Sequence, residues 1–76
     1  MMKAPYIMNV IHETLEPILE ETVQVEQIDA TTFTVHTEDV QDMYTVQLKE
    51  DDTTYYLEAY ESNNNNDKET IYHEYK

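Results

Sequence analysis

The sequence predicts a single α+β domain over residues 1–76: an N-terminal helix packed on one face of an antiparallel β-meander of four to five strands. Two observations lead to this prediction. The spacing of the hydrophobic residues changes from about 3.6 to 2 after residue 22, which indicates a helix followed by strands. The alternating segments that follow are short and separated by polar turns, as in a meander of neighbouring strands.

The helix is predicted over about residues 5–21. Pro5 suits the first turn, where its missing N–H leaves no helical hydrogen bond unmade. Pro17 removes such a bond, so we expect the helix to be kinked or broken near residues 14–16. Glu13, Glu16 and Glu20 form an acidic stripe on the outer side. The opposite, apolar face has spacings of three and four residues and consists of Ile7, Met8, Ile11, Leu15, Ile18, Leu19 and Thr22.

Residues 22–60 predict a meander of four strands, because each of four segments alternates and is rich in Val, Thr and Tyr. The same alternation directs Tyr56, Glu58, Tyr60 and His36 to the sheet face away from the helix. The residues predicted to face the helix are Val23, Val25, Phe33, Val35, Tyr44, Val46, Leu48, Tyr55, Leu57 and Ala59.

Two predicted turns agree with these faces. A two-residue turn at Asp51-Asp52 aligns Val46 with Leu57, and a four-residue loop over 38–41 aligns Phe33 with Val46. Both place inward residues opposite inward residues, as a correct register requires. In a chain without glycine, Asp tolerates left-handed backbone better than most residues.

The C-terminal part is predicted to be an Asn-rich polar loop over residues 61–69 and a fifth strand over residues 70–75. Ile71, His73 and Tyr75 fall on one face of this strand, whereas Tyr72 falls on the other. The pattern leaves open which of the two faces is buried.

The composition argues against catalysis, and we expect no enzyme activity, no cofactor and no metal. There is no cysteine, no arginine and no glycine, and Ser62 is the sole serine. Nucleophilic and phosphoryl-transfer sites are usually built from such residues. The three histidines have no zinc spacing. Asn63, Asn65, Asp67 and Glu74 have the spacing of calcium ligands, but a lysine replaces the glycine that such a loop needs.

The charge is the strongest functional signal. The chain has seventeen acidic residues and four lysines, which gives a formal net charge of −13. Solubility of a small domain needs a net charge of only about 2–8. The charge repels nucleic acid and anionic membranes, which are bound through Lys and Arg. We therefore expect a basic protein as partner, no direct contact with nucleic acid or membrane, and a cytoplasmic location, because the sequence shows no signal-like or membrane-spanning segment.

The function predicted from this charge is mimicry of nucleic acid, with carboxylates in place of phosphates on the surface of a basic nucleic-acid-binding protein or enzyme. In size, charge and element order the chain resembles, as a class, the small DNA-mimic inhibitors of phages; no motif ties it to one family. The predicted partner-binding residues are Glu13, Glu16, Glu20, His36, Glu50, Asp51, Asp52, Tyr56, Glu58 and Tyr60.

Two alternatives stay open. The Tyr-bearing sheet face or the edge of the last strand would serve a structural or assembly protein, so that the chain is either a monomer or a homodimer. The other is an acidic domain in which Tyr56 and Tyr60 cover each other across the sheet.

Overall fold

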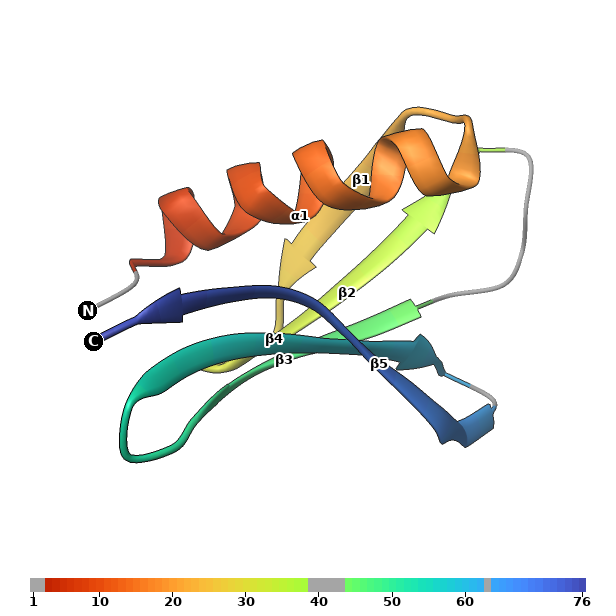
Figure 1. Cartoon of the computed structure of the whole chain (residues 1–76). Helices are drawn as coiled ribbons and strands as arrows, with labels where there is room; N and C mark the ends of the chain where they lie inside the picture. The colour runs from red at the N-terminus through yellow and green to blue at the C-terminus, as the bar shows by residue number, and fades with distance from the viewer. Residues whose placement is uncertain (1–2, 39–43, 63) are drawn as a thin grey trace.

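Figure 1 shows the computed structural model of the chain, which describes residues 3–38, 44–62 and 64–76. One helix, α1 (Ala4–Leu19), lies across one face of a five-stranded antiparallel sheet. The strands are neighbours in sequence order: β1 (Val23–Gln27), β2 (Thr32–Thr37), β3 (Tyr44–Glu50), β4 (Thr54–Glu61) and β5 (Asn64–Tyr75). The predicted α+β fold is confirmed.

Of the two predicted alternatives, a kink or a break near residues 14–16, the break is not found, because the helix is continuous through Pro17 to Leu19. Because Pro17 lies in the last turn, its missing N–H removes only one hydrogen bond before the helix ends. The buried face also differs from the prediction. Val10 is buried, whereas Ile18 is 65% exposed. The completely or nearly buried residues of the helix are Ile7, Val10, Ile11 and Leu15.

The inner face of the sheet supplies the other half of the core. Phe33, Val46 and Ala59 are aligned across β2, β3 and β4. Phe33 and Val46 are fully buried, and Val35 and Leu57 are as well. The predicted alignment of Phe33 with Val46 is therefore confirmed, although residues 39–41 of the predicted loop lie outside the described residues.

The register between β3 and β4 differs from the prediction by two residues. Val46 is aligned with Ala59 rather than with Leu57, and Glu50 with Tyr55. Four residues, 51–54, therefore lie between the aligned residues Glu50 and Tyr55, whereas the prediction has two residues between the aligned pair. A shift of two residues keeps every side chain on its predicted face, so the pattern of buried residues cannot distinguish the two registers.

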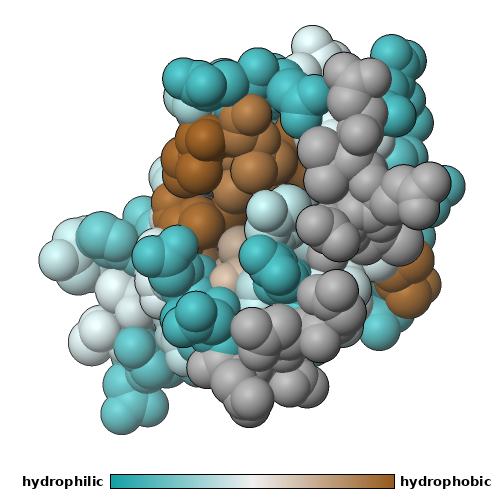
Figure 2. All heavy atoms as spheres, turned by 90° about the vertical axis from the view of Figure 1, so that its right-hand side faces the viewer, coloured by the Kyte–Doolittle hydropathy of each residue, from teal (hydrophilic) through white to brown (hydrophobic). Residues whose placement is uncertain are grey.

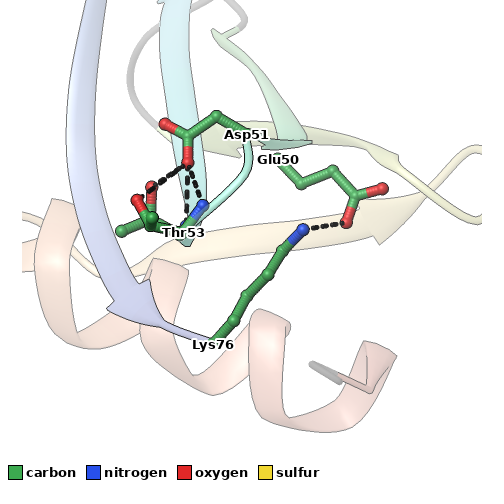
Figure 3. A network of polar contacts seen from close by, with 5 residues as sticks. Glu50, Asp51, Thr53 and Lys76 are labelled. Atoms are coloured by element: carbon green, nitrogen blue, oxygen red, sulfur yellow. Dashed lines mark hydrogen bonds and ion pairs between the residues drawn. The ribbon is translucent and has the colours of Figure 1, made fainter.

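The carboxylate of Asp51 holds this turn in place (Figure 3). It accepts hydrogen bonds from the backbone N–H groups of Thr53 at 2.9 Å and Thr54 at 2.8 Å, and from both threonine hydroxyls at 3.3 Å and 2.8 Å. These bonds, the one from the Thr53 N–H first, lower the pKa of Asp51 to about 2. The expected left-handed backbone at Asp51 or Asp52 is not found, because Glu20 is the one described residue with positive φ. The turn is thus closed by a side chain.

The β1–β2 turn repeats this arrangement. The carboxylate of Asp29 accepts hydrogen bonds from the backbone N–H of Thr31 at 2.9 Å and from its hydroxyl at 3.3 Å. The bond from the Thr31 N–H is the main reason that the pKa of Asp29 is lowered. Both turns have the sequence Asp-x-Thr-Thr, at residues 29–32 and 51–54. In both turns the Asp side chain accepts backbone hydrogen bonds, so that the turn forms without glycine.

The last strand is longer than predicted. β5 begins at Asn64, so residues 64–69 of the predicted polar loop belong to the strand. Leu57 is aligned with Tyr72 and Glu58 with Thr70, which leaves Ile71 as an extra residue in a bulge. Ile71 and Tyr72 therefore both pack against the core. The bulge explains why simple alternation did not indicate which face of this strand is buried.

We predict that Asp51→Ala lowers the melting temperature at pH 7, because the two backbone N–H groups lose their acceptor. Asp51→Asn should lower it less, because the amide oxygen still accepts. The folded state holds the pKa of Asp51 at about 2, below an unfolded value of about 3.9. The contribution of its charge is therefore complete above about pH 4 and is lost as the pH falls toward 2.

Thermal unfolding measured by circular dichroism between about pH 2 and pH 7 checks this prediction. The difference between the unaltered protein and Asp51→Asn should shrink as the pH falls. Asp52→Asn is the matched control, because no hydrogen bond of this neighbouring side chain is found among the described residues. Equal melting temperatures for Asp51→Ala and Asp52→Asn at pH 7 would show that the carboxylate does not hold the turn.

Candidate functional site

The topology divides the molecule into two ends. An antiparallel meander returns to the same end after every second strand, so alternate connections lie together. The C-terminus of α1, the start of β1, the end of β2, the start of β3, the end of β4 and the start of β5 share one end, on the right in Figure 1. The β1–β2 turn, the β3–β4 turn, the start of α1 and the end of β5 lie toward the other end.

Carboxylates gather at the first of these ends, which we call the acidic end. Its members come from segments that are far apart in the sequence, and most of them line two separate hollows. Glu61, Asp67 and Glu69 line the one beside β4 and β5, and Glu21 and Glu38 line the one at the start of β1 and the end of β2. Among the described residues the acidic end consists of Glu16, Glu20, Glu21, Glu38, Glu61, Asp67 and Glu69. Lys68 is the lysine of the described residues that lies nearest, above the ring of Tyr60.

The helix C-terminus adds to this negative charge. The carbonyl groups of a C-terminal turn carry a partial negative charge that basic side chains normally offset. The last turn of α1 has no basic residue. Glu20 follows it as the C-cap, with left-handed backbone at φ 58°. This position favours glycine over a residue with a side chain.

Glu16 connects the helix to the sheet. Its carboxylate accepts a hydrogen bond from the backbone N–H of Val23 at 3.1 Å, where β1 begins. The same oxygen lies 3.6 Å from Nδ1 of His12, one turn earlier in the helix. Glu16 therefore has a structural role, whereas Glu13 is exposed on the outer side of the helix. The predicted acidic stripe thus contains three carboxylates in different environments.

The predicted residues of the β3–β4 turn lie at the opposite end, separate from the acidic end. Glu50 forms an ion pair with the Nζ atom of Lys76 at 3.2 Å (Figure 3). Asp51 is engaged in the turn, and Asp52 is exposed. Lysines therefore offset part of the charge here. The structure does not bring the two predicted groups of carboxylates together.

The outer sheet face, which we define as the face away from α1, carries the predicted aromatic residues. The register aligns Tyr56 with Lys49 and His73, and Tyr60 with Thr45. The Nζ atom of Lys68 lies 5.3 Å from the ring centroid of Tyr60. The expected position of both tyrosines is confirmed.

The other two predicted residues of the outer sheet face have partners within it. Glu58 forms an ion pair with the Nζ atom of Lys49 at 3.5 Å. The Nε2 atom of His36 lies 3.1 Å from the side-chain oxygen of Gln24, its cross-strand neighbour. With Glu26 and Lys68 included, the outer sheet face carries as many lysines as carboxylates among its described residues. Its charge is balanced, unlike that of the acidic end.

An apolar groove opens at the acidic end, between the C-terminal part of α1 and strands β4 and β5. Its volume is about 340 Å³. Figure 2 looks at this end of the molecule and shows hydrophobic side chains exposed between hydrophilic ones. The groove is lined by Leu15, Ile18, Leu19, Tyr44, Ala59 and Ile71 and also by Tyr60, Glu61, Asp67 and Glu69, which we call its rim.

The path of β5 explains the groove. Near the N-terminus of α1, the hydroxyl groups of Tyr6 and Tyr72 are 2.9 Å apart, and this hydrogen bond is the main reason that the pKa of Tyr6 is raised to about 12. Toward its start, β5 passes a second irregularity in its pairing with β4, between Ala59 and Glu61, and lies away from the helix (Figure 1). Because bulges bend and twist a strand, Ile18 and Ile71 keep an opening between them.

Sequence reasoning missed the groove and most of the acidic end. Glu21, Glu38, Glu61, Asp67 and Glu69 were not among the predicted residues. The signal was available: in the predicted meander, the helix C-terminus and the connections near residues 38 and 61 all fall at one end of the sheet. The sequence gives no comparable signal that Ile18 is exposed, because its spacing along the helix places it on the predicted apolar face.

Among the described residues, no group of three or more histidine, aspartate or glutamate side chains is placed to hold a metal ion. The segment with calcium-like spacing is an extended strand over its described part, from Asn64 to Glu74. No described helix has the length and apolar character needed to span a membrane.

Comparisons of the chain with family models, with curated proteins and with solved structures found no match. The surfaces described above are therefore the basis on which a function is inferred.

We predict that Glu20→Gly raises the free energy of unfolding by about 0.5–1 kcal/mol, because glycine adopts left-handed backbone without the clash of a Cβ atom. Chemical denaturation measures this change. Glu21→Gly is the control, because it removes an equal charge from the neighbouring residue, whose φ is not positive. If both variants gain equally, relief of charge repulsion rather than backbone geometry is the cause.

Proposed function

We propose that this chain is a non-catalytic acidic binding protein that occupies the nucleic-acid-binding surface of a basic protein or enzyme, as phage and mobile-element inhibitors do. The observation that carries the proposal is the acidic end. Seven described carboxylates lie there, on α1 and the two residues after it, on the residue after β2, and on β4 and β5, beside a helix C-terminus without a basic residue.

This arrangement acts against stability, which favours a functional interpretation. Carboxylates near a helix C-terminus are repelled by its partial charge, and close like charges repel one another. A surface selected for solubility alone has both signs interspersed. The separation of an acidic end from a balanced outer sheet face therefore supports a role in which concentrated negative charge meets a basic surface.

Such a surface works mainly through electrostatic steering. A field of one sign accelerates the encounter with a basic partner and competes with the phosphates of nucleic acid for the same Lys and Arg side chains. Apolar contacts then decide how long the complex lasts. The groove beside the carboxylates provides apolar surface at the same end of the molecule.

We predict that the immobilised protein retains a basic nucleic-acid-binding protein from a lysate of the source cell and releases it when excess duplex DNA is added. Raising the salt concentration from about 50 to about 200 mM should also release it, because both changes weaken contacts between carboxylates and basic side chains. Mass spectrometry identifies what is retained. A retained partner that is indifferent to DNA would contradict the mimicry.

Two double variants with equal net charge locate the surface. Glu21→Lys with Glu38→Lys alters the acidic end, and Glu50→Lys with Asp52→Lys alters the β3–β4 turn. Each raises the formal net charge from −13 to −9. With the purified partner, the first pair should reduce the association rate about tenfold. If the second pair reduces it as much, the overall charge matters and its position does not.

The outer sheet face favours a second candidate, self-assembly. Tyr75 is 76% exposed. Its ring lies 5.9 Å from that of His73 in an edge-to-face contact, next to Tyr56 in the register. The balanced charge of this face would not prevent two copies from meeting.

We predict for this candidate a molar mass that rises with concentration in light scattering after size-exclusion chromatography. Tyr75→Ser should abolish the rise, because it removes an exposed ring, and Tyr75→Phe should keep it. A constant monomer mass at all concentrations would contradict self-assembly.

A further inference from the structure

We infer that the apolar groove receives one or two hydrophobic side chains of a basic amphipathic peptide segment, whose flanking Lys or Arg residues meet the carboxylates at the rim. The inference rests on the proposed function, because it specifies which part of a basic partner docks and where. It depends on the shape, lining and charge of the groove.

The groove is suited to side chains of the size of Leu, Ile or Phe. Its volume of about 340 Å³ lies at the low end for ligand pockets, but it exceeds what one such side chain fills. Ile18 stands on the helix side with 65% of its surface exposed, and the partly buried Ile71 stands on the β5 side. Covering them with apolar groups would remove hydrophobic surface from water.

The rim selects the charge of the occupant. Glu61, Asp67 and Glu69 line the groove, and no lysine does so among the described residues. Glu20 lies at the neighbouring helix C-terminus. A neutral or acidic apolar segment would gain nothing from this rim, whereas Lys or Arg on either side of an apolar residue would pair with it. An amphipathic helix with a basic polar face meets both requirements.

A second copy of the chain is a poorer occupant. Each copy has a formal net charge of −13, so two acidic ends brought together would repel each other. The other exposed large hydrophobic residues lie away from the groove and its acidic rim. Tyr6 is in the first turn of α1, Ile28 is at the β1–β2 turn, and Tyr75 is on the outer sheet face.

The test uses a synthetic amphipathic peptide of about 15 residues with leucine at helical spacing and lysine elsewhere. A second peptide keeps the lysines but replaces every leucine with serine. Isothermal titration at about 150 mM salt, where exposed ion pairs are largely screened, should show at least tenfold tighter binding of the leucine peptide. Equal affinities would mean that charge alone binds the peptide, and the groove would have no role.

Two matched variants localise the binding. Ile18→Gln alters the groove, and Ile28→Gln alters an isoleucine of similar exposure, 65% against 59%, elsewhere on the molecule. Neither changes the net charge. Ile18→Gln should weaken binding of the leucine peptide about tenfold, as expected for the loss of one buried apolar contact. Ile28→Gln should leave the affinity within about twofold, because this side chain lies outside the groove.

Three further outcomes test the inference, once each variant has been shown to fold. Circular dichroism confirms that each variant is folded; if Ile18→Gln unfolds the chain, Ile71→Val provides a milder alteration of the same groove and should weaken binding about threefold, by loss of one methylene. Equal weakening by Ile18→Gln and Ile28→Gln would overturn the inference. Light scattering that shows a dimer lost in Ile18→Gln would also overturn it, in favour of a second copy.

The inference and the proposed function fail separately. If a cellular partner is displaced by DNA but binds Ile18→Gln and the unaltered protein equally, the mimicry stands and the groove is not used. If the leucine peptide requires Ile18 but the cellular partner is indifferent to DNA, the groove is a peptide site and the mimicry fails.

Discussion

The hydrophobic layer between α1 and the inner face of the sheet holds this molecule together against the mutual repulsion of its carboxylates. Phe33, Val46 and Ala59 are aligned across the central strands, and the helix contributes Ile7 and Ile11 to the same cluster. The described elements form two layers, so the outer sheet face gains no burial from a third. In a chain of 76 residues with a formal net charge of −13, this single layer provides most of the hydrophobic stabilisation.

Some of the carboxylates stabilise the fold by accepting backbone hydrogen bonds, and these differ from the carboxylates that make no such bond. Asp29 and Asp51 close turns in a chain without glycine, and Glu16 accepts the first N–H of β1. Side-chain acceptors at turns satisfy backbone groups that a glycine turn would satisfy by its own conformation. The acidic residues that make no such contact and gather at one end, such as Glu38 and Glu69, are the better candidates for function.

The bulge in β5 connects the fold to the proposed site. It turns Ile71 and Tyr72 toward the core together, and the part of the strand that precedes it lies away from the C-terminal part of α1. The groove is the result of this divergence, and it opens where the topology collects carboxylates. The pairing of β4 with β5 is irregular at two places, at Ile71 and between Ala59 and Glu61. These irregularities place apolar surface and negative charge side by side, a combination that a basic amphipathic partner would match.

The sequence by itself determined the fold class, the presence of the helix, the faces of β1 to β4 and the β2–β3 register, because each depends on the local period of hydrophobic residues. It did not determine the β3–β4 register, since a shift of two residues leaves the pattern of faces unchanged. It did not predict that β5 begins at Asn64, because asparagine is typical of loops. It did not predict the bulge at Ile71 either, because a bulge interrupts the alternation from which strand faces are inferred. The sequence also indicated an acidic binding protein, but it divided the carboxylates by their position along the chain. Only the tertiary structure placed Glu21, Glu38 and Glu69 at one end and left Ile18 exposed there, because the packing of distant segments decides which charges share an end of the molecule and which part of the helix stays uncovered.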